Sequence, residues 1–154
     1  MQLLFLILIL STATLLGNEF SVGVFIHPAL SRAHHERFLP AIQVFAALFG
    51  KIMPFWMAAT ALVHLILLSL TWNWPAPHTV LLLAATLLWF AIIVFSLVGP
   101  VPINDRVKAW DSQKLPPDWQ EQIRRWDRLH VIRVVIIALA FLALILSYKA
   151  LATK

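Results

Sequence analysis

A short stretch late in the chain, RRWDRLHVIR (Arg124–Arg133), holds the side-chain types that acid–base chemistry needs, and it directly precedes the apolar run VVIIALAFLALIL. On a helix that turns about 100° per residue, Trp126, Asp127 and Arg133 lie within about 60° of His130. The other three arginines point to the opposite side, which is typical of contacts with lipid phosphates. The His130 side combines a ring, an acid, an imidazole and a guanidinium, a set that a headgroup anchor does not need.

Imidazole is the side chain whose ordinary pKa lies nearest neutrality, so His130 is predicted to be a general base. Asp127 would orient the imidazole or stabilise its charge. Arg133, together with Asn104, would stabilise an anion formed on a substrate. Trp126 would form a wall of the pocket. The alternative interpretation is that this face is a structural network that only ties helices together.

The elements that must position these residues are membrane helices. The chain has 154 residues, of which 61% are hydrophobic and only 12% are charged, and this composition indicates one integral membrane domain over residues 1–154. The absence of cysteine excludes disulfide and thiolate chemistry. The net charge of +5 collects at the ends of apolar runs. That pattern favours the lipid bilayer over nucleic acid as a partner.

Four apolar runs, at about 3–26, 40–70, 78–98 and 129–151, each exceed the roughly 20 residues that a membrane-spanning helix needs. They predict an all-α, four-helix transmembrane bundle. The first run has no Lys or Arg before it and continues to Ile26, so it is predicted to be a retained helix rather than a signal peptide.

The loops predict the orientation of the bundle. Loops at about 27–39 and 99–128 hold eight Lys and Arg, whereas the opposite side holds only Lys149 and Lys154. The positive-inside rule therefore predicts that both loops are cytoplasmic and both termini non-cytoplasmic. The protein would be a multi-pass membrane protein, in the inner membrane if the source is bacterial.

Ionisable and amide side chains inside a span are costly and are functional hypotheses by default. Glu19 lies about two turns inside its span, with Gly23 on the same face, and must be protonated, paired with a cation or bound to a metal. Arg133 is its natural partner, and Lys51 is a rival that would otherwise snorkel. Gln43 lies on a face rich in small residues, and a buried amide needs hydrogen-bond partners.

The residues His27, Gln43, Asn104 and His130 are expected at one level near the cytoplasmic boundary, and this convergence is the best pointer to a site. Trp126, Gln43 and His27 are the predicted substrate contacts. Glu19, His27 and His130 are ligand types that suit iron or copper. No tight ligand spacing accompanies them, so a cofactor-independent reaction stays open beside the metal hypothesis.

The remaining histidines carry weaker predictions. His34 and His35 lie in a charged loop and are expected to be solvated. His64 has no histidine at matching depth, which argues against a haem held by two helices. His78 begins a helix at the outer interface and is expected to anchor it there. None of them receives a functional role from the sequence.

Two stretches, GVFIHPAL and PINDRVKAW…PPDWQEQIRRWDRLHVIR, resemble the small membrane family that contains the fungal anthrone oxygenases. The resemblance covers nearly the whole chain. It implies an oxygenase, in some members one that uses O₂ without flavin or haem. Glu19 and Gln43 are candidates from burial alone. The positions that match are His27, Pro28, Asn104, Trp119, Arg125, Trp126, His130 and Arg133.

Two functional hypotheses follow. The first is a membrane-embedded oxidase or monooxygenase that uses O₂ as co-substrate and acts on a lipophilic phenol- or anthrone-like molecule, at a site near the cytoplasmic end of the bundle. The second is a non-catalytic membrane scaffold or binding protein that assists a partner enzyme. Association of copies into a homo-oligomer is open under both. The individual substrate is not readable from the sequence.

Overall fold

The computed structural model describes residues 1–32 and 35–153, without the side chains of residues 35–37. His34 and the side chain of His35, which are predicted to be solvated, therefore lie outside the described residues. The helices are α1 (Gln2–Ser21), the π-helical segment η1 (Val22–Ile26), α2 (His27–Ser31), α3 (His35–Thr71), α4 (Pro77–Val98), α5 (Pro100–Lys108) and α6 (Trp119–Ala152).

These helices form four long rods, because α1, η1 and α2 run on without a break and α5 follows α4 after one residue. Each rod is long and apolar enough to cross a membrane. The described part of the chain contains no strand. The predicted all-α, four-helix transmembrane bundle is confirmed, and the chain is a multi-pass membrane protein.

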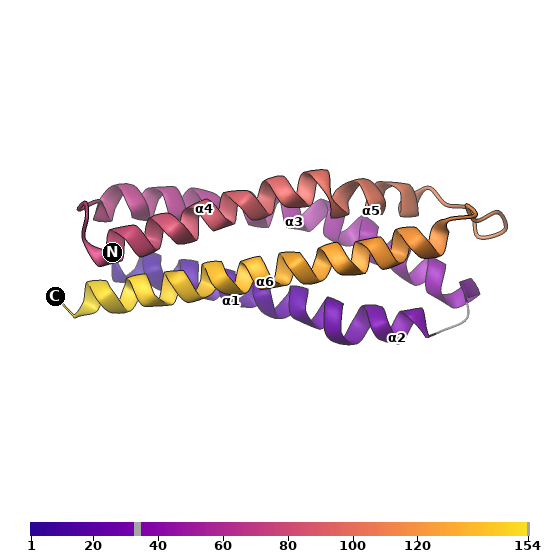
Figure 1. Ribbon diagram of the computed structural model, residues 1–154, viewed down its shortest axis with the longest axis horizontal. Coiled ribbons are helices and arrows are strands. Elements are labelled where there is room, and N and C mark those ends of the chain that lie inside the picture. The colour runs from indigo at the N-terminus through magenta and orange to yellow at the C-terminus, as the bar shows by residue number, and fades with distance from the viewer. Residues whose placement is uncertain (33–34, 154) are drawn as a thin grey trace.

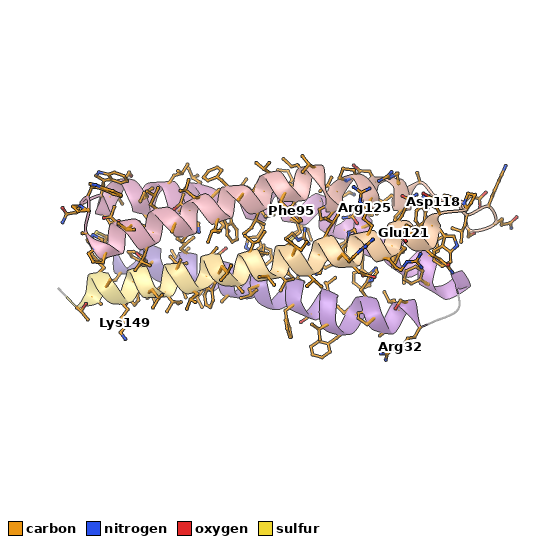
Figure 2. The ribbon with its side chains drawn as sticks, viewed as in Figure 1. Arg32, Phe95, Asp118, Glu121, Arg125 and Lys149 are labelled. Atoms are coloured by element: carbon orange, nitrogen blue, oxygen red, sulfur yellow. The ribbon has the colours of Figure 1, made fainter. Side chains whose placement is uncertain are left out.

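The four rods lie side by side in an elongated bundle (Figure 1). Both termini lie at the end that holds the α3–α4 connection, whereas α2 and α5 lie at the opposite end. The labelled side chains of Arg32, Asp118, Glu121 and Arg125 gather at that second end (Figure 2). Helix α6 already begins at Trp119, so it projects beyond the predicted fourth span. The side of the membrane that each end faces stays a prediction.

The bundle core consists of three apolar layers stacked along its axis. The layer near the termini includes Phe5, Leu67 and Leu144, and the middle layer includes Leu15, Trp89 and Ile137. The third layer, around Phe38, Ile103 and Ile123, lies at the loop end. Many large apolar side chains are exposed on the outside of the rods, as a surface that faces lipid requires.

His78 does not lie at the surface as an interfacial anchor, and that expectation is wrong. Its side chain is buried, and its Nε2 lies 3.2 Å from the Thr71 carbonyl oxygen. The Ser147 hydroxyl donates to the His78 carbonyl at 2.7 Å. The residue therefore joins α3, α4 and α6. His64 is also buried, with its Nδ1 3.3 Å from the Thr86 hydroxyl.

Candidate functional site

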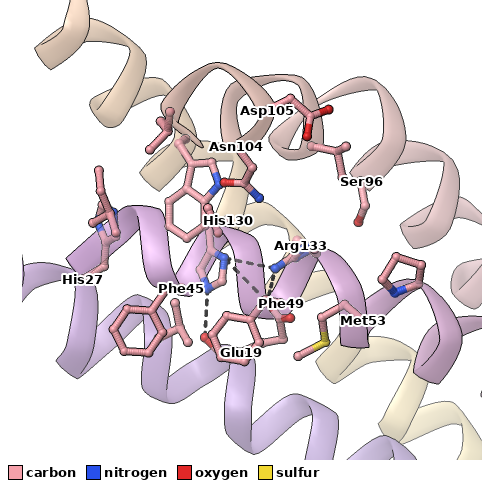
Figure 3. Close-up of a pocket in the computed structure, with 18 of the residues that line it drawn as sticks. Glu19, His27, Phe45, Phe49, Met53, Ser96, Asn104, Asp105, His130 and Arg133 are labelled. Carbon is pink, nitrogen blue, oxygen red and sulfur yellow. Dashed lines mark hydrogen bonds and ion pairs between the residues drawn. The ribbon is translucent and has the colours of Figure 1, made fainter. Parts of the chain in front are cut away.

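A cavity of about 400 Å³ lies between the middle and loop-end layers of the core. This volume falls in the range of about 300–1,000 Å³ that is usual for small-molecule sites. Most of its lining is apolar, and Phe45, Phe49 and Met53 stand along one wall (Figure 3). Its uncharged and basic polar lining comes from α1, α2, α4, α5 and α6: Asn18, His27, Ser96, Asn104, Lys108, Trp126, His130 and Arg133. The acids Glu19 and Asp105 also line it.

Glu19 and Arg133 form a buried ion pair across α1 and α6, as the sequence predicts. A guanidinium nitrogen of Arg133 donates to the Glu19 carboxylate. The same nitrogen lies 3.3 Å from Nδ1 of His130. Nε2 of His130 lies 2.8 Å from the backbone carbonyl oxygen of Glu19. One acid, one imidazole and one guanidinium therefore interlock, and His130 is only 1% exposed.

These contacts define the tautomer of His130. A carbonyl oxygen can only accept a hydrogen bond, and a guanidinium can only donate. Nε2 therefore carries the proton, and Nδ1 carries the lone pair that faces Arg133. Both nitrogens of this imidazole are occupied by protein groups. The geometry fits a residue that positions the cluster better than a base that is free to meet a ligand.

The close approach of His130 to the first rod depends on Gly23 and on the π segment. A Cβ at Gly23 would lie 2.9 Å from Cδ2 of His130 and 3.2 Å from its Nε2, so only glycine leaves room. Within η1 the His27 amide donates to the Val22 carbonyl, five residues back. Such a π turn shifts the helical bonds by one residue. The Glu19 carbonyl, just before this segment, accepts from the Val22 amide and from the His130 ring.

A second histidine–carboxylate pair lies beside this cluster. Nδ1 of His27 on α2 lies 2.7 Å from a carboxylate oxygen of Asp127 on α6. His27 is buried and lines the cavity, whereas the Asp127 side chain is 46% exposed. The Trp126 ring lies between the two imidazoles, with ring centroids 4.7 Å from His27 and 4.6 Å from His130.

Asp127 therefore does not orient His130, contrary to the expectation from helical spacing. Residues three apart on a helix point in similar directions, but the intervening Trp126 indole covers the His130 ring. The carboxylate instead reaches the neighbouring rod and accepts from His27. This arrangement gives His27, rather than His130, the carboxylate partner. His27 lines the cavity, and an imidazole held through Nδ1 in this way has only Nε2 left to meet a ligand.

The other predicted site residues are divided between the cavity and the scaffold. Asn104 lines the cavity from α5. Gln43 does not line it, because its amide nitrogen donates to the carbonyls of Val107 and Trp110 and ties α3 to the end of α5. Lys51 is exposed and takes no part in the cluster. Arg124 and Arg128 are exposed and pair with Glu121, on the side expected for an anchoring collar.

The structure brings two of the three predicted metal ligands together. Glu19 lies beside His130, with Oε2 3.6 Å from Nδ1, but His27 lies across the Trp126 ring and pairs with Asp127. Among the described side chains, those of residues 1–32 and 38–153, no group of three or more His, Asp or Glu is placed to hold a metal ion. The site therefore offers hydrogen-bond donors and an acid–base pair rather than an assembled set of metal ligands.

Four buried polar atoms of cavity-lining residues have no hydrogen-bond partner within the part of the chain that the structure describes: Nδ2 of Asn18, Oγ of Ser96, Nε1 of Trp126 and Nε of Arg133. Buried polar groups are nearly always paired, so water or a ligand in this cavity would have to pair with these atoms. Three of the four atoms are N–H donors. A ligand that paired with them would carry oxygen acceptors. The sequence patterns did not indicate Asn18 or Ser96, although Asn18 adjoins Glu19 and Ser96 precedes Pro100 by four residues.

The cavity also reaches the outer surface of the bundle. Gly50, Pro54 and Ala58, spaced four residues apart on α3, line the cavity and are exposed. Leu97 of α4 is likewise a lining residue that is exposed. Small side chains along one edge of α3 therefore leave the cavity open through the side of the bundle, within a surface that faces lipid.

Fold and cavity together define a multi-pass helical membrane protein with a cavity of small-molecule size beside a histidine–carboxylate–guanidinium cluster. The family model described as Anthrone oxygenase matches residues 43–143, more than half of the chain. The chain therefore belongs to the anthrone oxygenase family. The match includes Asn104, Trp126 and His130 and excludes Glu19 and His27. No curated protein and no solved structure matches the chain.

Proposed function

We propose that the protein is a membrane oxygenase that removes a proton from a lipophilic phenol- or anthrone-like substrate in this cavity and lets the resulting anion react with O₂. The observation that carries the proposal is the set of unpartnered N–H donors around an otherwise apolar cavity, beside an imidazole that a carboxylate holds. An apolar ring system with an oxygen that becomes negatively charged is the ligand chemistry that such a lining complements.

His27 is the base in this proposal. Its Nδ1–H donates to Asp127, which stabilises the imidazolium that forms when Nε2 takes a proton from the substrate. Asp127 is half exposed, so the proton can leave to solvent beside its carboxylate at the loop end of the bundle. His130 and Glu19 are positioning residues, because their contacts hold Arg133 in place.

The reaction balances without an added reductant when the substrate carries an activated methylene group, as an anthrone does. Loss of a proton from that carbon leaves a carbanion whose charge spreads onto the ring oxygen. The carbon then bonds to O₂, and loss of water from the peroxide gives a carbonyl. In sum, CH₂ and O₂ give C=O and H₂O. Donors from Arg133, Trp126 and Asn18 would stabilise the negative oxygen.

Access from the bilayer suits this substrate class. A lipophilic phenol concentrates in the membrane, and the cavity opens through the side of the bundle beside Gly50, Pro54 and Ala58. The substrate would reach the site without crossing water. We propose the lipid bilayer and this small molecule as the partners of the protein.

Replacement of the pair tests the proposal. We expect His27→Asn to lower kcat by about 10²- to 10⁴-fold, the usual contribution of a general base, with a smaller loss for Asp127→Asn. The measurements are O₂ consumption and anthraquinone formation from anthrone by the purified protein in nanodiscs. Glu121→Gln is the control, because Glu121 is an exposed acid on the same helix that pairs only with arginines there.

A folded His27→Asn protein with unchanged kcat would remove His27 as the base. A wild-type protein that neither binds nor converts anthrones would favour the scaffold hypothesis instead.

A further inference from the structure

Ser96 is an exception among the buried hydroxyl groups of the described residues. The other six all form a hydrogen bond: Thr12, Thr60, Thr71, Thr79, Thr86 and Ser147. The hydroxyl of a serine or threonine in a helix ordinarily donates a hydrogen bond to a backbone carbonyl one turn earlier. The Ser96 side chain, 5% exposed, makes no such bond. Its hydroxyl is therefore buried and without a partner.

The position of Ser96 adds a second open group. Helix α4 ends at Val98 and α5 begins at Pro100, with Gly99 between them at φ −106° and ψ −89°. Proline has no N–H, so Pro100 cannot donate the helical hydrogen bond that the Ser96 carbonyl would otherwise accept. A break of this kind exposes backbone groups within a membrane only where they line a cavity or pack against protein.

The unpartnered hydroxyl belongs to a residue that lines the cavity. Ser96 lies on α4, whereas His27 lies on α2 and Asp127 on α6. Figure 3 shows the Ser96 side chain directed into the space between its own helix and the Met53 and Arg133 side chains. Apolar Ile93, Leu97 and Met53 are among its neighbours in the lining. A ligand oxygen at this point would lose its hydrogen bonds to water, and the Ser96 hydroxyl could replace one of them.

We propose that Ser96 is a specificity-determining residue that binds a second oxygen of the substrate, apart from the oxygen that becomes charged. The inference rests on the proposed function, since it assigns the ligand of the same cavity. A hydroxyl can both donate and accept, so Ser96 suits a ring hydroxyl or a ring carbonyl. The protein then prefers fused-ring ligands that carry oxygen at two places over ligands with one.

The test is a binding measurement by calorimetry in nanodiscs without O₂, so that turnover does not interfere. The probes are anthrone and 2,7-dihydroxyanthrone, whose two hydroxyls lie away from the ring carbonyl. We expect the wild-type protein to bind the dihydroxy probe more tightly than anthrone. Ser96→Ala should lower the affinity for the dihydroxy probe by about fivefold to tenfold, the usual effect of one lost hydrogen bond. The affinity for anthrone should stay unchanged. Ser69→Ala, at an exposed serine that bonds its own helix, is the control.

Thermal unfolding separates ligand binding from a structural role. Because the Ser96 hydroxyl has no protein partner, Ser96→Ala should keep or raise the Tm. A lowered Tm, or an equal loss of affinity for both probes, would overturn the assignment. If wild type binds the two probes equally, the Ser96 assignment fails and the proposed function stands. If wild type binds neither probe, both fail.

Discussion

At the scale of single residues, the contacts distinguish His130, the predicted base, from His27, a predicted substrate contact. Both ring nitrogens of His130 contact protein groups, the Glu19 carbonyl and the Arg133 guanidinium. His27 binds Asp127 through Nδ1 and lines the cavity. One histidine therefore supports the structure of the site, and the other is suited to proton transfer.

Gly23 allows the first of these histidines to take its place, and this role can be tested. Gly23→Ala would put a methyl group 2.9 Å from the His130 ring, so we expect a destabilisation of about 1–3 kcal/mol and reduced activity. Gly17→Ala is the matched control, because a Cβ there has no neighbour within 4 Å. Loss of glycine from an open helical position should be neutral or stabilising.

Thermal unfolding of the two variants in the same detergent measures the difference. Equal melting temperatures would show that the His130 ring can move aside, and would contradict its role as a fixed support.

Several residues that line the cavity could be predicted from the sequence, whereas their pairings could not. Burial cost alone identified Glu19, and helical angles placed Arg133 and His130 on one face. Helical angles could not show that the Trp126 ring separates Asp127 from His130, because the orientation of a side chain depends on packing between rods. The sequence could not single out Ser96, because a serine in a membrane helix usually donates a hydrogen bond to the backbone of its own helix.

At the scale of elements, the Glu19–Arg133 pair joins α1 to α6 inside the membrane. Removing one partner leaves a buried charge without compensation, so Glu19→Gln and Arg133→Gln should each destabilise the bundle by about 3–5 kcal/mol. The double variant removes both charges and should be less destabilised than the sum of the single variants. A double-mutant cycle from reversible unfolding in detergent measures the coupling. Strictly additive effects would mean that the two groups do not interact.

The interruptions of the rods were less predictable than the rods themselves. Apolar runs of sufficient length predicted four spans, and the helices agree. The π segment at Val22–Ile26 has no signature in hydrophobic periodicity, since it shifts the bonding by only one residue. The break between α4 and α5 had a signal in Gly99 and Pro100 that was interpreted only as the start of a loop.

At the scale of the whole molecule, the orientation in the membrane follows from loop charge and can be tested directly. The chain has no cysteine, so a single introduced thiol reports one position. We expect Ser112→Cys, in the basic loop, to be protected from a membrane-impermeant maleimide in intact cells. Asn73→Cys, in the short loop between α3 and α4, should be labelled. The reverse pattern would invert the bundle.

The layered core has an electrical consequence. The cavity ends against the middle layer, around Trp89 and Ile137, and a further dry layer around Phe5 and Leu144 lies beyond it. A charge is costly within such apolar layers, and the polar side chains beyond them, such as His64 and His78, bond to neighbouring helices. In the proposed function, a proton taken from a substrate by His27 would leave toward the loop end, through Asp127. Turnover would therefore neither draw on the membrane potential nor dissipate it.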